Sequence, residues 1–236
     1  MIYRMLYICC FKLICKCSVF FIYLYLNLNM KSSEYIFKKL CRFDSDINEH
    51  LPTLKSYAQQ CTSIVELGVC DAVSTWAFIE GLRSNKKKSK TLLSVDINDV
   101  PDLEFIEKEA AKCKIDFTFL KENSIMVNIP ENTDLLFIDT WHVYGHLKRE
   151  LETHHRNVKK YIIMHDTEVD KMKGECLRVG TDPEEDSART GYPVDEITKG
   201  VGYAIVEFLE TYKDDWQVQL HYMNNNGLTI LEKISK

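Results

Sequence analysis

The chain has 236 residues, enough for one α/β domain with a sizeable core and too few for two domains of usual size. Apolar residues make up 45% of the sequence and charged residues 28%, as in ordinary soluble globular proteins. The formal net charge is −5, and residues 30–236 alone carry −8 because Arg4, Lys12 and Lys16 precede them without any acid. This acidic body lacks a dense basic face and argues against nucleic acid as a partner.

The nine cysteines show no pattern of disulfide or metal-ligand spacing. Four of them lie within residues 1–29, and the other five are scattered through the rest of the chain. Such usage is typical of a reducing compartment, where thiols act as small apolar side chains. We therefore expect a cytoplasmic protein, with membrane anchoring as the alternative.

Residues 1–29 form an apolar segment that differs from the rest of the chain. Its longest uncharged run, Cys17 to Met30, has 14 residues, against roughly 20 needed to span a bilayer. A basic start followed by an apolar stretch resembles a signal sequence, but no small-residue cleavage site follows. Three interpretations stay open: a translation start at Met30, a membrane anchor and an uncleaved signal. Only a genuine anchor would bring the protein into contact with a membrane.

After residue 30 the hydrophobic period alternates between that of a helix and that of a strand, as in α/β domains. Unalternated apolar strands such as DLLFID and YIIM are typical of a parallel sheet covered on both faces. The sequence NNNG at 224–227 predicts a terminal hairpin. We expect a helix capped by Asp46 or Asn48 that continues to about residue 60, and further helices over residues 73–82, 102–113, 145–158 and 201–212. Strands are expected over 63–67, 91–95, 116–120, 134–138, 161–164, 216–223 and 228–232.

Two polar segments interrupt this pattern. Lys86, Lys87, Lys88 and Lys90 are expected to lie in a solvated loop, since short charge runs usually stay in water. Residues 167–200 form a long polar segment without clear periodicity. A loop of that length in a compact domain is usually a lid, a binding loop or disordered, and we expect a lid or substrate loop within a single domain of residues 30–236.

Polar residues follow the ends of the expected parallel strands, which is where open α/β sheets bind their ligands. Four of these five ends carry an acidic residue, whereas a lone aspartate there is commonly a turn former. Together they predict a ligand site at one edge of the sheet. The strand ends are Glu66 with Gly68, Asp96, Asn123 with Ser124, Asp139, and His165 with Asp166.

The residues from Glu66 to Thr75 predict a tight turn from a strand into a helix. Gly68 allows close approach of the backbone to a ligand, and Ser74 or Thr75 can satisfy the helix N-terminus. Asp96, about 30 residues further on, is placed to accept hydrogen bonds from vicinal ribose hydroxyls. The pattern indicates a nucleoside-containing cofactor and is shared by dinucleotide binders and S-adenosylmethionine binders.

Five segments carry a resemblance to a known family: VELGVCDAVSTWAF, LLSVDIN, KENSI, DLLFIDTWHVYGHLKREL and YIIMHDT. In order and spacing they resemble the class I S-adenosylmethionine-dependent methyltransferases over residues 44–236. Within that class they are closest to the branch of cephalosporin-hydroxylase-like proteins and macrolide-sugar O-methyltransferases. The resemblance implies a Rossmann-like α/β fold, with a seven-stranded, mostly parallel sheet in the order 3-2-1-4-5-7-6 and a C-terminal antiparallel hairpin.

The resemblance also implies roles for individual residues. Glu66 and Gly68 would begin the first cofactor motif, Asp96 would bind ribose, and Asn123 and Ser124 would lie beside adenine, with Asp139 also at the cofactor site. One departure stands out. Family members usually carry glycine where this chain has Ala72, and often glycine or arginine at Cys70. The loss of glycine narrows the turn and would weaken cofactor binding.

Asp139 and Asp166 end strands that the fold makes neighbours, so their carboxylates can share one hard cation. By resemblance the two hold Mg²⁺, and His165 stands where a second acid is often found. Histidine is a poor ligand for magnesium, so we do not expect direct contact there. His142 matches the position of the general base in sugar O-methyltransferases, and could deprotonate a metal-bound hydroxyl. The alternative is that His142, Tyr144 and His146 only flank a helix.

The sequence therefore predicts S-adenosylmethionine-dependent O-methylation of a hydroxyl on a small polar or sugar-like substrate, with divalent-metal assistance. A homo-oligomer is compatible with the sequence. One alternative is an oxygenase of the cephalosporin-hydroxylase type, which the absence of a 2-His-1-carboxylate pattern disfavours. The other is a catalytically degenerate binding protein, which Ala72 favours.

Overall fold

The computed structural model describes residues 32–234. The expectations for residues 1–29 fall outside this range. No helix in the described part of the chain is both long enough and apolar enough to cross a bilayer.

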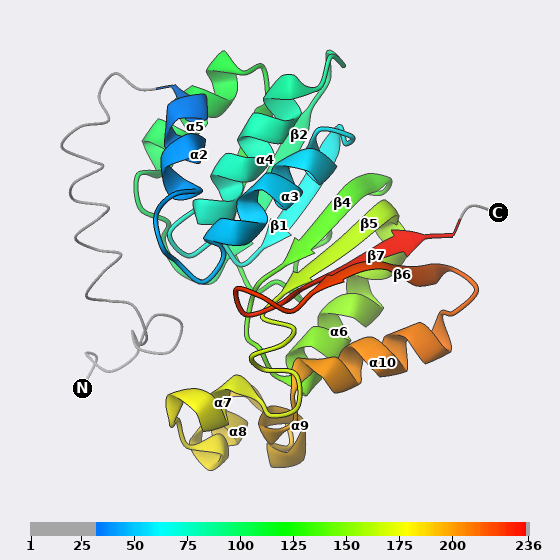
Figure 1. The fold of residues 1–236 in the computed structure, drawn as a ribbon. Helices are drawn as coiled ribbons and strands as arrows, with labels where there is room; N and C mark the ends of the chain where they lie inside the picture. The colour runs from blue at the N-terminus through cyan, green and yellow to red at the C-terminus, as the bar shows by residue number, and fades with distance from the viewer. Residues whose placement is uncertain (1–31, 235–236) are drawn as a thin grey trace.

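A single seven-stranded sheet runs through the molecule in the order β3-β2-β1-β4-β5-β7-β6 (Figure 1). The five strands from β3 to β5 are parallel, and β7 pairs antiparallel with both β5 and β6. Both the fold class and the strand order expected from the sequence are confirmed. The strands are β1 Ser63–Leu67, β2 Thr91–Asp96, β3 Asp116–Lys121, β4 Thr133–Ile138, β5 Val158–His165, β6 Trp216–Tyr222 and β7 Leu228–Lys233.

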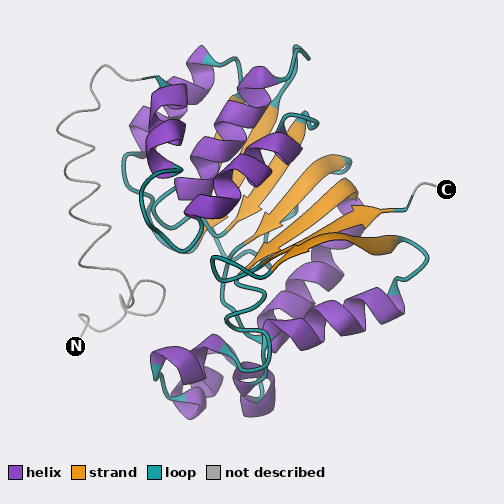
Figure 2. Ribbon diagram, in the orientation of Figure 1, coloured by secondary structure: helices purple, strands orange, loops and turns teal. Residues whose placement is uncertain are grey.

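Helices cover both faces of this sheet, and Figure 2 shows the strands as the middle layer. Every residue of β4 is buried, because apolar side chains meet a helical layer on each side. One buried cluster of apolar residues joins the sheet to helices α2, α3, α4 and α5, and a second joins it to α6 and α10. The first layer comprises α2 Ser33–Leu40, α3 Leu51–Ala58, α4 Val73–Ser84 and α5 Leu103–Lys112; the second comprises α6 Tyr144–His154 and α10 Val201–Thr211.

The terminal hairpin turns through three successive residues with positive φ, as the NNNG sequence predicts. Asn225 has φ 46°, Asn226 has φ 67° and Gly227 has φ 95°. Asparagine and glycine tolerate this left-handed conformation best. The turn packs against the chain ahead of α3, where the Asn225 side chain accepts a hydrogen bond from the Glu49 amide at 3.1 Å and donates one to the Ser45 carbonyl at 2.8 Å.

Several local expectations were wrong. The helix expected over 145–158 ends at His154, and Val158 already belongs to β5 after a short 3-10 turn, η2 His155–Asn157. Helix α2 was not predicted. The helix expected to be capped by Asp46 or Asn48 begins with a 3-10 turn, η1 Asn48–His50, which has no side-chain cap. Lys90 is buried rather than solvated, and its ammonium group donates to the Cys113 carbonyl at 3.1 Å.

Residues 167–200, hereafter the insert segment, contain three short helices instead of irregular loop alone. They are α7 Glu175–Val179, α8 Pro183–Thr190 and α9 Val194–Thr198. The helices lie beyond the ends of the parallel strands, next to α6 and α10 (Figure 1). Because the helices are only five to eight residues long, they are too short to produce a clear hydrophobic period.

Candidate functional site

The turn after β1 lies in direct contact with the end of β4. Gly68 has φ +86°, and a Cβ at this position would lie 1.9 Å from the carbonyl oxygen of Asp139. The Asp139 amide donates to the Leu67 carbonyl at 2.8 Å, and the Gly68 amide donates to the Val95 carbonyl at 2.9 Å. Glycine is therefore required at residue 68 for two reasons, its backbone conformation and the available space.

The same turn holds two other residues in the left-handed region, and neither is glycine. Cys70 has φ 47° and Ala72 has φ 59°. These are the two positions at which the resembled family usually carries glycine, at Ala72, or often glycine or arginine, at Cys70. The turn thus keeps a glycine-like backbone while carrying side chains that disfavour it, at a cost of about 1 kcal/mol for each residue.

Glu66 lies beneath this turn, fully buried. Its carboxylate accepts hydrogen bonds from three hydroxyls, those of Ser74 at 2.6 Å, Thr75 at 2.9 Å and Ser94 at 2.6 Å. Burial raises the pKa of Glu66 to about 7, against the lowering effect of these donors. The prediction that Ser74 or Thr75 caps α4 was wrong, since Ala72 is the N-cap residue and both hydroxyls are directed to Glu66. Glu66 therefore supports the turn from below.

Asp96 ends β2 and ties the turn to the neighbouring strand. Its Oδ2 atom accepts hydrogen bonds from the amides of Val69 at 2.8 Å and Cys70 at 3.0 Å. Its Oδ1 atom accepts from the Asn98 amide at 2.8 Å. A carboxylate offers about four lone-pair sites, so these three amides leave room for a further donor.

Asn123 and Ser124 follow β3 at the same edge of the sheet. The Asn123 side chain is exposed and accepts from the Ile125 amide at 3.0 Å. Ser124 is buried, and its hydroxyl lies 3.2 Å from Nε2 of His146. The structure thus brings the turn, Asp96 and Ser124 to one edge, in the order that the sequence predicts.

Asp139, His142 and Asp166 form the group best arranged to hold a metal ion in the described part of the chain. One ligand atom from each lies within 4.8 Å of the other two. Nε2 of His142 is 3.1 Å from Oδ1 of Asp139, and Nδ1 is 3.1 Å from Oδ2 of Asp166. His165 lies beside them, with Nδ1 at 3.3 Å from Asp139 and 3.2 Å from Asp166.

Two buried atoms in this group are without a hydrogen-bond partner, Nδ1 of His142 and Oδ1 of Asp166. Each lies within ion-pair distance of a neighbour but is not aligned for a hydrogen bond. Buried polar atoms are rarely left unpaired, and a cation is one explanation for those that are. With two carboxylates and one imidazole, the donors fit a hard or borderline divalent ion.

The charges of this group act strongly on one another. Burial opposes ionisation of His142, yet Asp166 and Asp139 raise its pKa well above the ordinary value. Burial also lowers the pKa of His165, but the Asp139 and Asp166 carboxylates outweigh this effect and raise the pKa to about 9. In turn, the two imidazoles hold the pKa of Asp139 below its ordinary value despite burial. The neighbouring carboxylates therefore favour the protonated form of both imidazoles.

Three further carboxylates near His142 and His165 were not singled out from the sequence. Asp170 and Glu175 of the insert segment each lie 3.5 Å from Nδ1 of His142. Burial raises the pKa of Asp46, and the nearby Asp139 carboxylate raises it further. No sequence signal separates Asp170 and Glu175 from the other acids of the polar segment, because their role depends on how the segment folds back.

A second polar network adjoins the first and centres on Glu150 of α6, which is fully buried. The Thr140 hydroxyl donates to its carboxylate at 2.9 Å, and Nε2 of His146 lies 3.3 Å away. Burial raises the pKa of Glu150, but His146 and the hydroxyl donors bring it below the ordinary value. One signal was present in the sequence: Glu150 stands between Leu147 and Leu151 on the apolar face of the helix.

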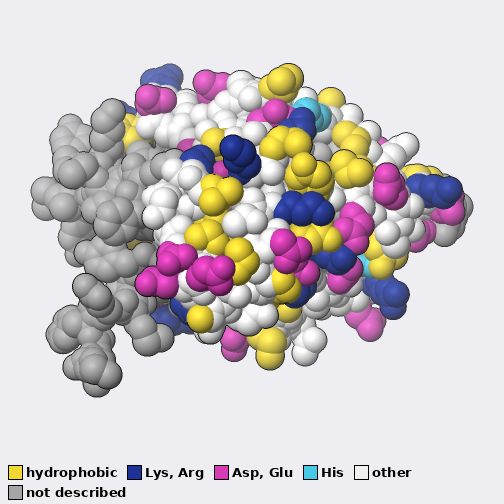
Figure 3. All heavy atoms as spheres, turned by 90° about the horizontal axis from the view of Figure 1, so that it is seen from below, with side chains coloured by type: hydrophobic (Ala, Val, Ile, Leu, Met, Phe, Trp, Pro, Cys, Tyr) yellow, Lys and Arg dark blue, Asp and Glu magenta, His cyan; other side chains and the backbone are white. Residues whose placement is uncertain are grey.

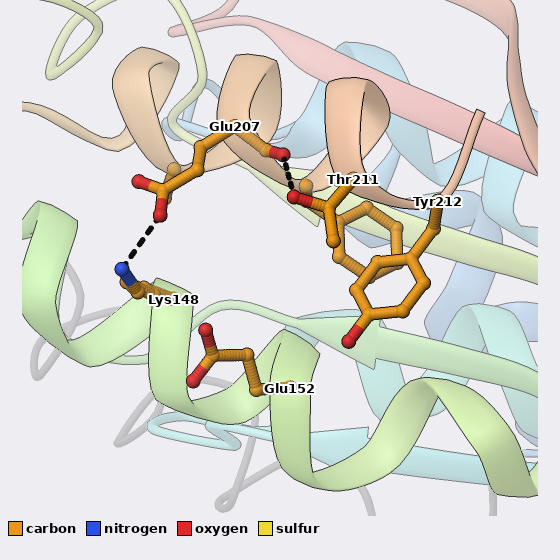
Figure 4. Close-up of a pocket in the computed structure, with 7 residues that line it drawn as sticks. Lys148, Glu152, Glu207, Thr211 and Tyr212 are labelled. Atoms are coloured by element: carbon orange, nitrogen blue, oxygen red, sulfur yellow. Dashed lines mark hydrogen bonds and ion pairs between the residues drawn. The ribbon is translucent and has the colours of Figure 1, made fainter.

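One cavity lies away from these groups, in a shallow cleft between α6 and α10. Figure 4 shows Lys148 and Glu152 on α6 facing Glu207 and Thr211 on α10, with Lys148 paired to Glu207 at 2.6 Å. No strand-end residue lines it. A smaller cavity adjoins the candidate site and is lined by Ile138, Thr140, Trp141, His142, Leu147, Glu150, Met164, His165 and Val201.

No protein-family model and no curated protein matches the chain. Solved structures do match. The O-methyltransferase from Bacillus cereus in complex with SAH superposes with a TM-score of 0.51 at 14% identity, covering 91% of this chain and 96% of that one. The 1,6-didemethyltoxoflavin-N1-methyltransferase from Burkholderia thailandensis, with bound 1,6-didemethyltoxoflavin and S-adenosylhomocysteine, gives 0.54 at 8% identity, covering 93% and 88%.

At these identities the likeness establishes the fold. The chain has the Rossmann-like fold of the class I methyltransferases, with the antiparallel seventh strand inserted between β5 and β6. A fold of this kind hosts many chemistries, so the activity has to be argued from the site itself.

Proposed function

We propose that this protein is an S-adenosylmethionine-dependent methyltransferase that methylates a hydroxyl of a small polar or sugar-like acceptor with the help of a divalent cation. One observation carries the proposal: the candidate cofactor turn and the acidic group touch, through Gly68 and Asp139. A methyl donor on the turn and a hydroxyl held at the acidic group would therefore be neighbours, as group transfer requires.

On the cofactor side, the backbone at Gly68 approaches the donor closely, and Asp96 accepts from ribose hydroxyls. Asp96 has capacity for one more donor beyond its three amide contacts. Asn123 and Ser124 lie beside adenine. Glu66 acts from below, through Ser74 and Thr75, to hold the turn in shape.

On the acceptor side, Asp139 and Asp166 would hold the cation. When bound, a divalent cation such as Mg²⁺ lowers the pKa of an acceptor hydroxyl. With the cation and the methyl donor bound, His142 would accept the hydroxyl proton as the oxygen bonds to the methyl carbon and the sulfur–methyl bond breaks. The added positive charge would offset the two carboxylates that raise the pKa of His142, leaving the imidazole free to take up a proton.

The insert segment forms the lid of the acceptor side. Glu175 makes two hydrogen bonds with the main chain of His142. Its amide donates to the His142 carbonyl at 3.0 Å, and its carboxylate accepts from the His142 amide at 3.4 Å. On the face seen in Figure 3, basic and acidic side chains are interspersed with apolar ones. This surface supports a small-molecule acceptor better than a nucleic acid, which prefers a continuous basic face.

Calorimetry with S-adenosylhomocysteine and S-adenosylmethionine tests the proposal. We expect both to bind, and expect Asp96→Ala to weaken binding by about 1–3 kcal/mol because ribose hydroxyls lose a charged acceptor. Glu122→Ala, which removes an exposed carboxylate near the same edge, is the matched control. Absence of binding to the parent protein would favour a degenerate binding protein, as the side chains at Cys70 and Ala72 suggest.

A further inference from the structure

His146 contacts both the candidate cofactor site and the insert segment. Its Nε2 atom lies 3.2 Å from the hydroxyl of Ser124, at the end of β3. Its Nδ1 atom lies 3.3 Å from the hydroxyl of Tyr192, between α8 and α9. One imidazole ring therefore spans the distance between the residue expected beside adenine and the proposed lid.

The buried Glu150 carboxylate lies beside one of the two ring nitrogens of His146, Nε2. Nε2 lies 3.3 Å from Oε1 of Glu150. An ionised carboxylate accepts hydrogen bonds only, so it favours a proton on Nε2. In the neutral ring Nδ1 is then an acceptor, and the Tyr192 hydroxyl donates to it.

Tyr192 is held on its other sides by rings and charges. It stacks on Trp141, with ring centroids 6.0 Å apart and planes at 24°, and the Arg149 guanidinium lies 4.1 Å from its ring centroid. Arg149 also pairs with Glu196 of α9 at 2.6 Å. Trp141 is the residue before His142, so the position of Tyr192 influences both the lid and the acceptor side of the site.

We propose that His146 is a positioning residue that couples occupancy of the cofactor site to the order of the insert segment. A cofactor resting on Ser124 fixes His146, which fixes Tyr192 and with it the wall formed by Trp141. The inference rests on the proposed function, since it needs a nucleoside cofactor beside Ser124. Because coupling between two sites is reciprocal, an ordered insert segment also strengthens binding of the cofactor.

The consequence is an order of binding. The cofactor binds first and completes the acceptor pocket, and the acceptor then enters a site whose wall is in place. Removal of the Tyr192 hydroxyl breaks the chain of contacts while leaving the stack on Trp141 and Arg149, so Tyr192→Phe separates coupling from packing.

Amide hydrogen exchange, followed by mass spectrometry over residues 175–198, tests the coupling with S-adenosylhomocysteine as the probe. In the parent protein we expect saturating probe to slow exchange there by about threefold or more. In Tyr192→Phe and His146→Leu this slowing should vanish. Tyr203→Phe, at an exposed tyrosine of α10, is the matched control and should keep the slowing.

The outcomes are separable from those for the proposed function. If the probe binds the parent by calorimetry and Tyr192→Phe retains the full slowing, the coupling is refuted and the proposed function stands. If the probe does not bind the parent at all, both fall together. If Tyr192→Phe binds the probe within about threefold of the parent and loses the slowing, the coupling role of His146 is supported.

Discussion

A Cβ atom on Gly68 would lie 1.9 Å from the carbonyl oxygen of Asp139. This contact joins the turn that follows β1 to the strand end that carries Asp139, the first of the two proposed acidic ligands. Any side chain at residue 68 must therefore displace the backbone of β4 and with it Asp139. A change in the candidate cofactor turn at residue 68 therefore also displaces the acidic group at Asp139.

Gly68→Ala should accordingly destabilise the protein by about 2–4 kcal/mol, because it adds a backbone clash to the cost of a positive φ. Gly180→Ala is the matched control, since Gly180 has φ +79° with nothing within 4 Å of its added Cβ. It should cost only about 1 kcal/mol. Denaturant unfolding of the two variants measures the difference, and equal losses would contradict the clash.

Glycine at Cys70 and at Ala72 should have different effects. Cys70 is exposed, so Cys70→Gly removes left-handed strain without losing buried surface and should stabilise by about 0.5–1 kcal/mol. Ala72 is 1% exposed, so Ala72→Gly loses a buried methyl group and should be close to neutral. Unfolding free energies decide the matter; a loss on Cys70→Gly would mean that its side chain stabilises the turn.

Much of the fold and part of the site could be predicted from the sequence. The apolar runs defined the strands, and the residues at their ends, such as Asp96 and Asp139, came together because parallel strands end at one edge. Residues whose role depends on tertiary packing were missed. Tyr192 and Glu175 lie in a polar segment whose helices are too short to show a hydrophobic period. Lys90 resembles its solvated neighbours in sequence, and only the structure shows that its ammonium group donates to the Cys113 carbonyl.

Replacement of either proposed acidic ligand should weaken cation binding and leave the cofactor side intact. Asp139→Asn and Asp166→Asn should each weaken Mn²⁺ binding tenfold or more, because the remaining carboxylate is a single charged donor. Asp214→Asn, an exposed acid after α10, serves as control. Titration of Mn²⁺ by calorimetry or electron paramagnetic resonance measures this. If both variants bind Mn²⁺ like the parent, the cation site lies elsewhere.

His142→Ala separates a base from a ligand. As a general base, His142 should contribute about 10²-fold or more to turnover, with Mn²⁺ affinity changed by less than about threefold. Turnover measured in parallel with Mn²⁺ titration distinguishes the roles. A loss of affinity as large as that of Asp166→Asn would make His142 a ligand, which its 3.1 Å distances to both carboxylates permit.

His155 should make the stability of the protein fall in mild acid. It is 4% exposed, and its ring packs against Phe208 and Tyr212 with centroids 5.3 and 4.1 Å away. Its Nε2 atom has no hydrogen-bond partner. Burial, together with Arg156 and Lys233, lowers the pKa of His155 to about 4 from an ordinary value of 6.5. The folded protein therefore prefers the neutral ring.

The sign of the effect follows from proton binding. Between about pH 6.5 and pH 4 the unfolded chain binds a proton at His155 that the folded protein does not, so acid favours unfolding. The stability contributed by the neutral ring is fully present above pH 6.5 and declines toward pH 4. His155→Phe keeps the aromatic packing and removes the titration. We expect the free energy of unfolding, measured with denaturant, to fall by about 1–2 kcal/mol more in the parent than in the variant between pH 7 and pH 5. Equal losses would mean that the His155 ring binds its proton equally well in the folded and the unfolded chain.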